Sequence, residues 1–439
     1  MAINKMKSGF MYASLTAGIT ASVAAALMAL PALGWEMGDP IVTYWAGPGY
    51  PGSKMQISDA SLKQLKDCGF NLVWASSKKD LDLIAKWGLR AICQLGIDRG
   101  KNLDPDNCDG FRRRIEGLKG HPALYIYHHC DEPSVGWFKG LAADSRIAQS
   151  IDPKHPTWVN LLPTYANNSQ LGLEGEIISA YREHVRLFLE TYDPAFVSYD
   201  HYQLNNGWDT SNYFLNLSIV QQACAARGIP FMNGVQACTW CPPKNFASPS
   251  APRIPGPDEM RYLVYTTLAY GAQGIYYYVY SHPGHRGSIV SQDGVPDAKY
   301  HELSKLNPIF VATAKQLRGY RLMGAYFKGY CPRGGTPYGP NAILDFADGT
   351  KSEPLPEKKE LADSILVSRF DALNRPTRLM VVNLDYRKER SLEITAPSAV
   401  TRFDPNTGKW MPLGEKFTLD LAKGEGTLLQ VDNSPRRQE

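Results

Sequence analysis

Two adjacent carboxylates, Asp131 and Glu132, follow an apolar and aromatic run that ends in two histidines and a cysteine, and Pro133 comes directly after them. Carboxylates are rarely buried unless they are paired, so folding alone gives no reason for this pair at the end of a buried strand. The alternative is that Asp131 caps the next helix and Glu132 is a solvated acid in its first turn. We predict a catalytic role, with Glu132 as a general acid.

The elements around this pair alternate regularly between strands and helices. Predicted strands occupy residues 41–45, 70–74, 89–95, 123–127, 157–162, 196–199, 230–235 and 274–280. A helical pattern follows each strand, so eight strand-helix units in order predict a (β/α)8 barrel of the α/β class. Active sites of that fold lie at the carboxyl ends of the strands, where the Asp-Glu pair also falls.

The chain divides into five predicted segments. A signal peptide is predicted for residues 1–34, and the barrel for residues 35–325. A connection rich in glycine and proline is predicted for residues 326–356, followed by a smaller all-β sandwich at 357–432, because short alternating runs separated by turn signals are typical of that fold. Residues 433–439 are predicted to be a frayed tail.

The first segment has the features of an export signal. Lys5 and Lys7 precede an apolar, alanine-rich run, which ends in the small residues of Ala32-Leu33-Gly34 before Trp35. The alternative is an uncleaved membrane anchor, but the small residues favour cleavage. No later stretch is long and apolar enough to span a bilayer. We therefore expect a secreted or periplasmic protein without stable membrane insertion.

Composition narrows the partners. The net charge is only +4 and no basic run stands out before the tail, which argues against nucleic acid. The eight cysteines permit disulfides, and Cys238 and Cys241 have the spacing of a zinc or redox pair. A lone pair of this kind more often forms a local disulfide or two thiols, so no metal and no cofactor are predicted. A metal-dependent hydrolase that uses His128, His129 or the Cys pair is a weaker hypothesis. The sequence predicts no oligomeric state.

Other polar and aromatic residues fall near the predicted strand ends. As a set they offer stacking faces together with neutral donors and acceptors, which is what a polyhydroxylated ligand needs. For His128 and His129, tuning of Glu132 and a hydrogen-bonded core role are equal alternatives. The predicted ligand-binding residues are Tyr44, Trp45, Trp74, His128, Asn160, Tyr165, His201, Tyr202, Gln236, Tyr280 and His282.

An exported barrel with a strand-four acid and a C-terminal sandwich resembles the clan A glycoside hydrolases, in particular family 42-like enzymes. In that clan a strand-four motif, usually Asn-Glu and often followed by Pro, carries the acid/base. Cys130-Asp131-Glu132-Pro133 resembles this motif, with Asp131 in the place of the usual Asn. The resemblance implies a glycosidase that cleaves O-glycosidic bonds of an oligo- or polysaccharide, with Glu132 as general acid/base.

One position departs from the clan. Its nucleophile is a Glu at the end of strand seven, where this chain has Gln236. A first explanation is that Asp200 supplies the second carboxylate, with a separation from Glu132 of about 5 Å for retention or ~6.5–9.5 Å for inversion. Asp200 is equally well explained as an acid that orients His201 or binds a sugar hydroxyl.

Two further explanations of Gln236 stay open. The adjacent acids also resemble those of hexosaminidases that use the acetamido group of the substrate as nucleophile, with Asp131 orienting that group. Neighbouring side chains on a strand normally point in opposite directions, which counts against this mechanism. Finally, a barrel without its nucleophile is what a non-catalytic carbohydrate-binding protein would have.

Overall fold

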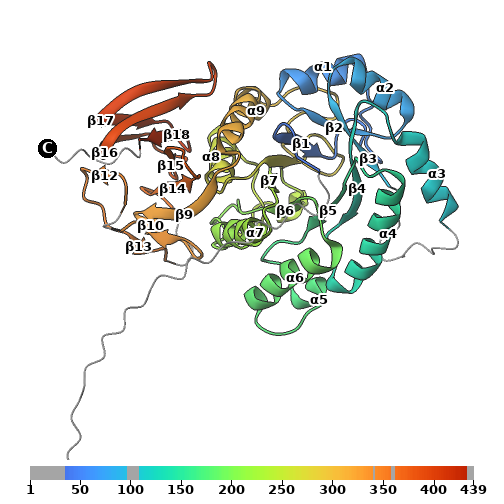
Figure 1. Ribbon diagram of the computed structural model, residues 1–439, viewed down its shortest axis with the longest axis horizontal. Helices are drawn as coiled ribbons and strands as arrows, with labels where there is room; N and C mark the ends of the chain where they lie inside the picture. The colour runs from blue at the N-terminus through green and yellow to red at the C-terminus, as the bar shows by residue number, and fades with distance from the viewer. Residues whose placement is uncertain (1–34, 96–107, 340–341, 357–360, 433–439) are drawn as a thin grey trace, which may run out of the picture.

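The computed structural model describes residues 35–95, 108–339, 342–356 and 361–432, which form a barrel followed by a β domain (Figure 1). The predicted signal peptide and the predicted tail lie outside these residues. Among the described residues, no helix has the length and apolar character needed to cross a membrane.

The barrel is a parallel sheet of eight strands in the order β1-β8-β7-β6-β5-β4-β3-β2. Asn71 closes the sheet between β1 and β2, because its backbone N–H donates to Val42 O (3.1 Å) and its Oδ1 accepts from Val42 N (3.0 Å). The predicted (β/α)8 barrel is confirmed. Its strands are β1 (Ile41–Trp45), β2 (Leu72–Ala75), β3 (Arg90–Gln94), β4 (Leu124–Asp131), β5 (Thr157–Leu161), β6 (Val197–His201), β7 (Phe231–Gln236) and β8 (Gly274–Tyr278).

Helices surround the sheet, and Figure 1 shows them outside the strands. Ser58 and Ser77 begin the first two helices with capping boxes, in which the serine hydroxyl accepts from the backbone N–H three residues later. The helices are α1 (Asp59–Asp67), α2 (Lys78–Lys86), α3 (Asp109–Leu118), α4 (Phe138–Ile151), α5 (Asn168–Leu171), α6 (Ile177–Tyr192), α7 (Tyr213–Arg227), α8 (Pro257–Ala269) and α9 (Ala298–Leu317).

The β domain is a mixed sheet in the order β11-β9-β14-β15-β18-β16-β12, and β17 pairs with β16. The predicted all-β domain is therefore present. The predicted connection contributes β11 and β12 to this sheet and forms a separate two-stranded sheet from β10 and β13. The strands are β9 (Arg321–Lys328), β10 (Tyr330–Cys331), β11 (Thr336–Pro337), β12 (Asp345–Phe346), β13 (Glu353–Pro354), β14 (Ile365–Asp371), β15 (Thr377–Asn383), β16 (Arg390–Asp404), β17 (Lys409–Leu421) and β18 (Gly426–Val431).

Alternation along the β-domain strands divides their apolar side chains between two cores. Ile365 and Val367 belong to a cluster within the domain that also contains residues of β16 and β17. Leu366 and Phe370 belong to the main core, which continues into the barrel helices. Both faces of β14 are thus buried, so the β domain is packed on the barrel rather than tethered to it.

Polar contacts also join the two parts. Tyr386 of the β domain donates from its hydroxyl to Asp209 Oδ2 (2.9 Å), on the loop after β6. Arg253, on the loop after β7, donates from Nη2 to the same hydroxyl (2.9 Å) and from Nε to Glu259 Oε1 (2.7 Å). The β domain therefore holds two of the loops that leave the carboxyl end of the barrel.

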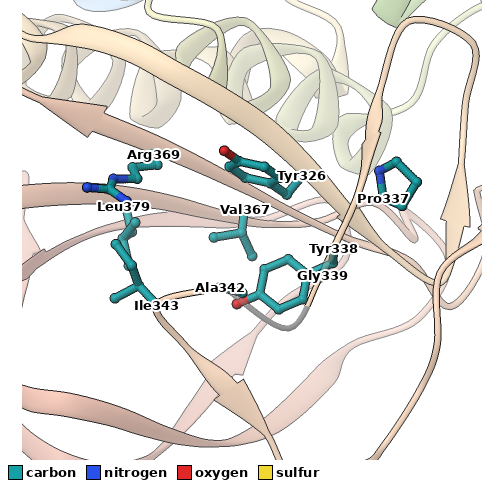
Figure 2. Close-up of a pocket in the computed structure, with 9 residues that line it drawn as sticks. All are labelled: Tyr326, Pro337, Tyr338, Gly339, Ala342, Ile343, Val367, Arg369 and Leu379. Atoms are coloured by element: carbon teal, nitrogen blue, oxygen red, sulfur yellow. The ribbon is translucent and has the colours of Figure 1, made fainter. Parts of the chain in front are cut away.

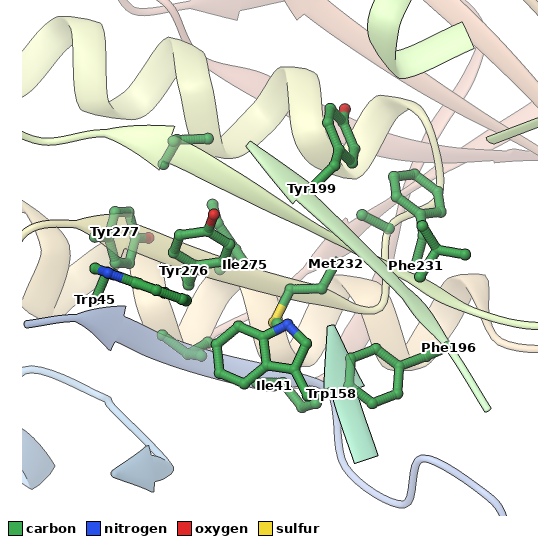
Figure 3. Packing of buried hydrophobic residues seen from close by; sticks show 14 of the residues in the cluster. Ile41, Trp45, Trp158, Phe196, Tyr199, Phe231, Met232, Ile275, Tyr276 and Tyr277 are labelled. Atoms are coloured by element: carbon green, nitrogen blue, oxygen red, sulfur yellow. The ribbon is translucent and has the colours of Figure 1, made fainter. Parts of the chain in front are cut away.

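The barrel interior is filled by large aromatic side chains, and Figure 3 shows Trp45, Trp158, Met232 and Tyr276 packed together. Trp45 lies edge-on to Trp158, with ring centroids 5.5 Å apart and an interplanar angle of 88°. These residues form a dense floor beneath the carboxyl ends of the strands, so that polar side chains just above them are held away from bulk water.

Candidate active site

The end of β4 does not follow simple alternation. His128 faces the barrel interior, where its ring contacts Trp45 and Trp74 at centroid distances of 5.2 and 5.1 Å. His129 faces the surrounding helices, with Nδ1 2.8 Å from the Tyr192 hydroxyl. The register with β5 shifts between His128 and Cys130, as it does at a β-bulge.

The shift decides where Asp131 points. After it, Asp131 pairs with Asn160 of β5, whose Nδ2 lies 3.3 Å from Asp131 Oδ1. The side chain therefore faces the inside of the barrel, three residues after His128. Because the strand contains one extra residue, the Asp131 carboxylate faces the barrel interior, where regular alternation would have placed the side chain of Cys130.

Glu132 leaves the strand in a left-handed backbone conformation, with φ of +50°. Its N–H still donates to Asn160 O (2.8 Å), so the residue is fixed at the strand end. This conformation costs a residue with a side chain about 1–2 kcal/mol. Among the described non-glycine residues with positive φ, only Glu132 and Ala46 are neither Asp nor Asn, and both follow barrel strands. Strain of this kind is typical of functional sites.

A buried histidine supports the chain just beyond Glu132. His184 of α6 donates from Nε2 to Pro133 O (3.0 Å), and its ring packs edge-on against Phe138. Burial lowers the pKa of His184 to about 4, so the ring is neutral at physiological pH. The turn after the acids is therefore held by a neutral donor.

Asn160 joins two of the carboxyl groups. Its Nδ2 lies 2.8 Å from Asp200 Oδ1 and also reaches Asp131. Its Oδ1 accepts from the hydroxyls of Ser198 (2.9 Å) and Tyr276 (3.0 Å). Because both ends of the amide are bound, Asn160 has one orientation and holds the acids of β4 and β6 together.

The three acids act on one another. Asp200 is 2% exposed, whereas Asp131 and Glu132 are half-buried. Burial raises the pKa of Asp200 well above its usual range, and the charges of Glu132 and then Asp131 raise it further. Burial followed by the charges of the same three acids also raises the pKa of Tyr276. Burial and the two neighbouring charges therefore favour the protonated form of Asp200.

Two predicted tyrosines join this cluster. Tyr202 donates a side-chain hydrogen bond to Asp200, which opposes the rise in the pKa of that acid. Tyr165, which is 47% exposed, accepts from the Tyr202 N–H at 3.4 Å, and its ring lies 4.9 Å from that of His201. The predicted acids, Asn160 and these tyrosines thus gather at the carboxyl ends of β4, β5 and β6.

Other predicted residues are occupied by structural contacts. Trp74 and His128 pack against Trp45 and so extend the aromatic floor of the barrel. His201 lies between Asn216 Oδ1 and Thr210 Oγ1, each at 3.0 Å, and burial lowers its pKa to about 4.

The polar groups of Tyr44, Tyr280 and His282 have partners other than the three acids. The hydroxyl of Tyr44 donates to Pro48 O (2.6 Å), and that of Tyr280 donates to Gln64 Oε1 (2.7 Å). Both rings are fully buried. His282 lies beside His285, with 3.2 Å between their Nδ1 atoms.

Gln236 is fully buried and its amide is bound to two loops. Its Oε1 accepts from Leu204 N (3.0 Å), and its Nε2 donates to Leu204 O (3.0 Å) and Arg253 O (2.8 Å). At the end of β7, where the resemblance expects a nucleophile, the side chain thus anchors loops.

Sequence reasoning missed Ser198 and Tyr276, which bind Asn160, and Tyr278, whose ring lies 4.9 Å from that of Tyr202. Their signal was alternation, because Ser198 precedes Asp200 by two residues and Tyr276 precedes Tyr278 by two. The position of Tyr276 also depends on Gly234, its partner in β7, where a Cβ atom would lie 2.1 Å from Tyr276 Cζ. A glycine in the middle of a strand was a sign that a ring crosses it.

The cysteines show no metal arrangement. All eight lie among the described residues and no disulfide joins them. Cys238 is buried, its thiol donates to Tyr278 O (3.3 Å), and burial raises its pKa to about 12. Within the described part of the chain, no group of three or more His, Cys, Asp or Glu residues is placed to hold a metal ion.

A separate pocket of about 300 Å³ lies in the β domain (Figure 2). No carboxyl group lines it, which distinguishes it from the acid cluster at the barrel. Its lining residues are Tyr326, Pro337, Tyr338, Gly339, Ala342, Ile343, Val367, Arg369 and Leu379.

No family model and no curated protein matches the chain. Solved structures that match include a putative alpha-galactosidase from Bacteroides fragilis (7% identity, 90% of this chain, 80% of that chain, TM-score 0.47). A GH27 β-L-arabinopyranosidase from Geobacillus stearothermophilus matches with 9% identity, over 90% of this chain and 98% of that one, with a TM-score of 0.44. A beta-galactosidase from Marinomonas matches with 8% identity, over 63% of this chain and 60% of that one, with a TM-score of 0.43. These neighbours are described as glycosidases, but scores below 0.5 assign this chain no activity.

Proposed function

We propose that the protein is a glycoside hydrolase in which Glu132 protonates the glycosidic oxygen. The observation that supports this most is the gathering of three carboxyl groups from β4 and β6 at the carboxyl end of the barrel, one fully buried with a raised pKa and two half-buried. Acids whose surroundings differ in this way can divide the roles of proton donor and charged stabiliser. The family 42-like assignment remains a prediction.

The partner of Glu132 in this proposal is Asp131. Asp200 is 2% exposed and the charges of both neighbours favour its protonated form, which makes it a poor nucleophile. Asp131 is half-buried, so a ligand reaches it more readily than it reaches Asp200, and it accepts from the Asn160 amide (3.3 Å). We assign Asp200 the role of a protonated support that holds Asn160 and Tyr202 in place.

One observation favours the substrate-assisted form of the reaction. Regular alternation would have kept Asp131 and Glu132 on opposite faces, but the shift in β4 and the left-handed turn at Glu132 let both charges act on Asp200. An acid that orients an acetamido group and an acid that donates a proton need this arrangement. A substrate with a 2-acetamido group is therefore the first to test.

The decisive experiment compares Glu132→Gln with wild type on aryl glycosides, including 2-acetamido-2-deoxyhexosides. We expect kcat to fall about 10³-fold, because the variant has the same shape but no proton to donate. Glu174→Gln, at an exposed position, is the matched control and should keep wild-type activity. Full activity in Glu132→Gln would rule out Glu132 as the proton donor. Sugar binding without hydrolysis by the wild type would instead favour a carbohydrate-binding barrel.

We also propose export with cleavage before Trp35, on the basis of the N-terminal sequence alone. N-terminal sequencing of the protein from the periplasm or medium should give Trp-Glu-Met. A start at Met1 or Ala2 in membranes would favour the uncleaved anchor.

A further inference from the structure

An exposed tryptophan adjoins the acid cluster. Trp240, on the loop after β7, is 36% exposed. Its ring lies 5.1 Å from that of Tyr202 and 5.5 Å from that of Tyr278, at interplanar angles of 61° and 89°. Tyr202 also hydrogen-bonds to Asp200, so its ring lies between the indole and the acids.

The backbone beside Trp240 is held on both sides. Thr239 N–H donates to Arg286 O (3.0 Å), and Arg286 N–H donates back to Thr239 O (2.9 Å). The Thr239 hydroxyl donates to Pro252 O (2.6 Å) and accepts from Cys241 N–H (3.2 Å). These bonds join the loops after β7 and β8, so the indole is presented on a fixed support.

Side-chain contacts hold the same support. The Arg286 guanidinium lies 4.4 Å from the ring centre of Phe246 and donates to Cys241 O (3.2 Å). The hydroxyl of Tyr278 lies 2.9 Å from His285 Nε2. Because Tyr278 is fixed by its neighbour as well as by Trp240, the indole is not needed simply to keep that ring in place.

We propose that Trp240 stacks against a sugar ring next to the ring whose bond is broken, and that the substrate is accordingly a glycan of at least two rings. This inference rests on the proposed function. The apolar C–H face of a pyranose matches an aromatic face, and a rigid aromatic side chain loses little entropy when it binds. A single sugar with a small leaving group would fill the acid cluster and leave the indole uncovered.

The test compares Trp240→Ala and Trp240→Phe on two substrates with the same terminal sugar, an aryl monoglycoside and the corresponding aryl disaccharide glycoside. Stacking predicts that Trp240→Ala lowers kcat/KM for the disaccharide glycoside about tenfold, at least five times more than for the monoglycoside. Trp240→Phe keeps a stacking face and should recover most of the loss. Equal losses on both substrates, or none on either, would overturn the proposal.

A binding measurement separates this proposal from hydrolysis itself. Calorimetric titration of Glu132→Gln with N,N′-diacetylchitobiose, cellobiose or lactose, with and without Trp240→Ala, needs no turnover. Weaker disaccharide binding in the double variant supports stacking even when the wild type hydrolyses nothing. Disaccharide binding that is unchanged by Trp240→Ala, or absent in the presence of monosaccharide binding, contradicts it. Melting temperatures check that each variant is folded.

Discussion

The ends of β4 and β7 lie in the same barrel but use their polar side chains in opposite ways. At the end of β4, Asp131 and Glu132 are half-buried, and the backbone of Glu132 is strained at φ +50°. At the end of β7, Gln236 is fully buried and its amide is bound to the backbone of two loops. The first end carries groups that a ligand can reach, and the second holds the loops that surround it.

The difference shows how this barrel departs from a scheme with acids on strands four and seven. The neutral amide of Gln236 is a necessary loop contact, so its conversion to an acid would disturb the loops rather than supply a nucleophile. The additional carboxyl groups come instead from the neighbour of Glu132 and from Asp200 of β6. Asn160 connects these two groups, so the carboxyl groups of the proposed site lie on β4 and β6.

The substitution Gln236→Glu should have the largest effect, and it tests whether the side chain at the end of β7 only anchors loops. The new carboxylate loses both donor bonds, leaves Leu204 O and Arg253 O without this partner, and is buried. We expect the free energy of unfolding at pH 7 to fall by about 3 kcal/mol, measured by urea denaturation. Gln222→Glu, on the exposed side of α7, is the control and should change it by less than about 0.5 kcal/mol. A stable and more active Gln236→Glu would restore the strand-seven nucleophile scheme.

The sequence located the two strands better than it predicted their side-chain directions. Apolar runs located β4 and β7, and the unusual carboxylates drew attention to Glu132. The run predicted for β4, residues 123–127, stops four residues before the strand ends at Asp131. Nothing in the residues marked the extra residue in β4, because a bulge depends on the pairing with β5. Likewise, Tyr280 was predicted to line the site because β8 was expected to continue to it. The strand ends at Tyr278, and that residue contacts Tyr202 instead.

The next effect in size is the pH dependence of stability, which should have opposite signs for His201 and Asp200 at the end of β6. Burial lowers the pKa of His201 to about 4, so the folded state takes up fewer protons than the unfolded state between pH 6.5 and 4. Stability from this group is therefore lost as the pH falls through that window. The pKa of Asp200 is raised, so its effect has the opposite sign: stability falls as the pH rises above about 4 towards its folded-state pKa.

Comparison with His201→Gln isolates the histidine. When the pH is lowered from 7 to 5, the unfolding free energy of the wild type should fall by about 2 kcal/mol more than that of His201→Gln. Over the same pH change, the unfolding free energy of the wild type should rise relative to that of Asp200→Asn. Identical pH dependence in the wild type and both variants would mean that neither group is perturbed as described.

The smallest predicted effect tests the strain at the end of β4. Alanine at position 132 keeps a Cβ atom in the left-handed conformation, whereas glycine adopts it freely. Glu132→Gly should therefore be about 1 kcal/mol more stable than Glu132→Ala, although both lack the acid. At the exposed helical position Lys79 the order should reverse, with Lys79→Ala more stable than Lys79→Gly. If glycine is also the less stable residue at position 132, the backbone there is relaxed, and β4 ends without the strain that distinguishes it from β7.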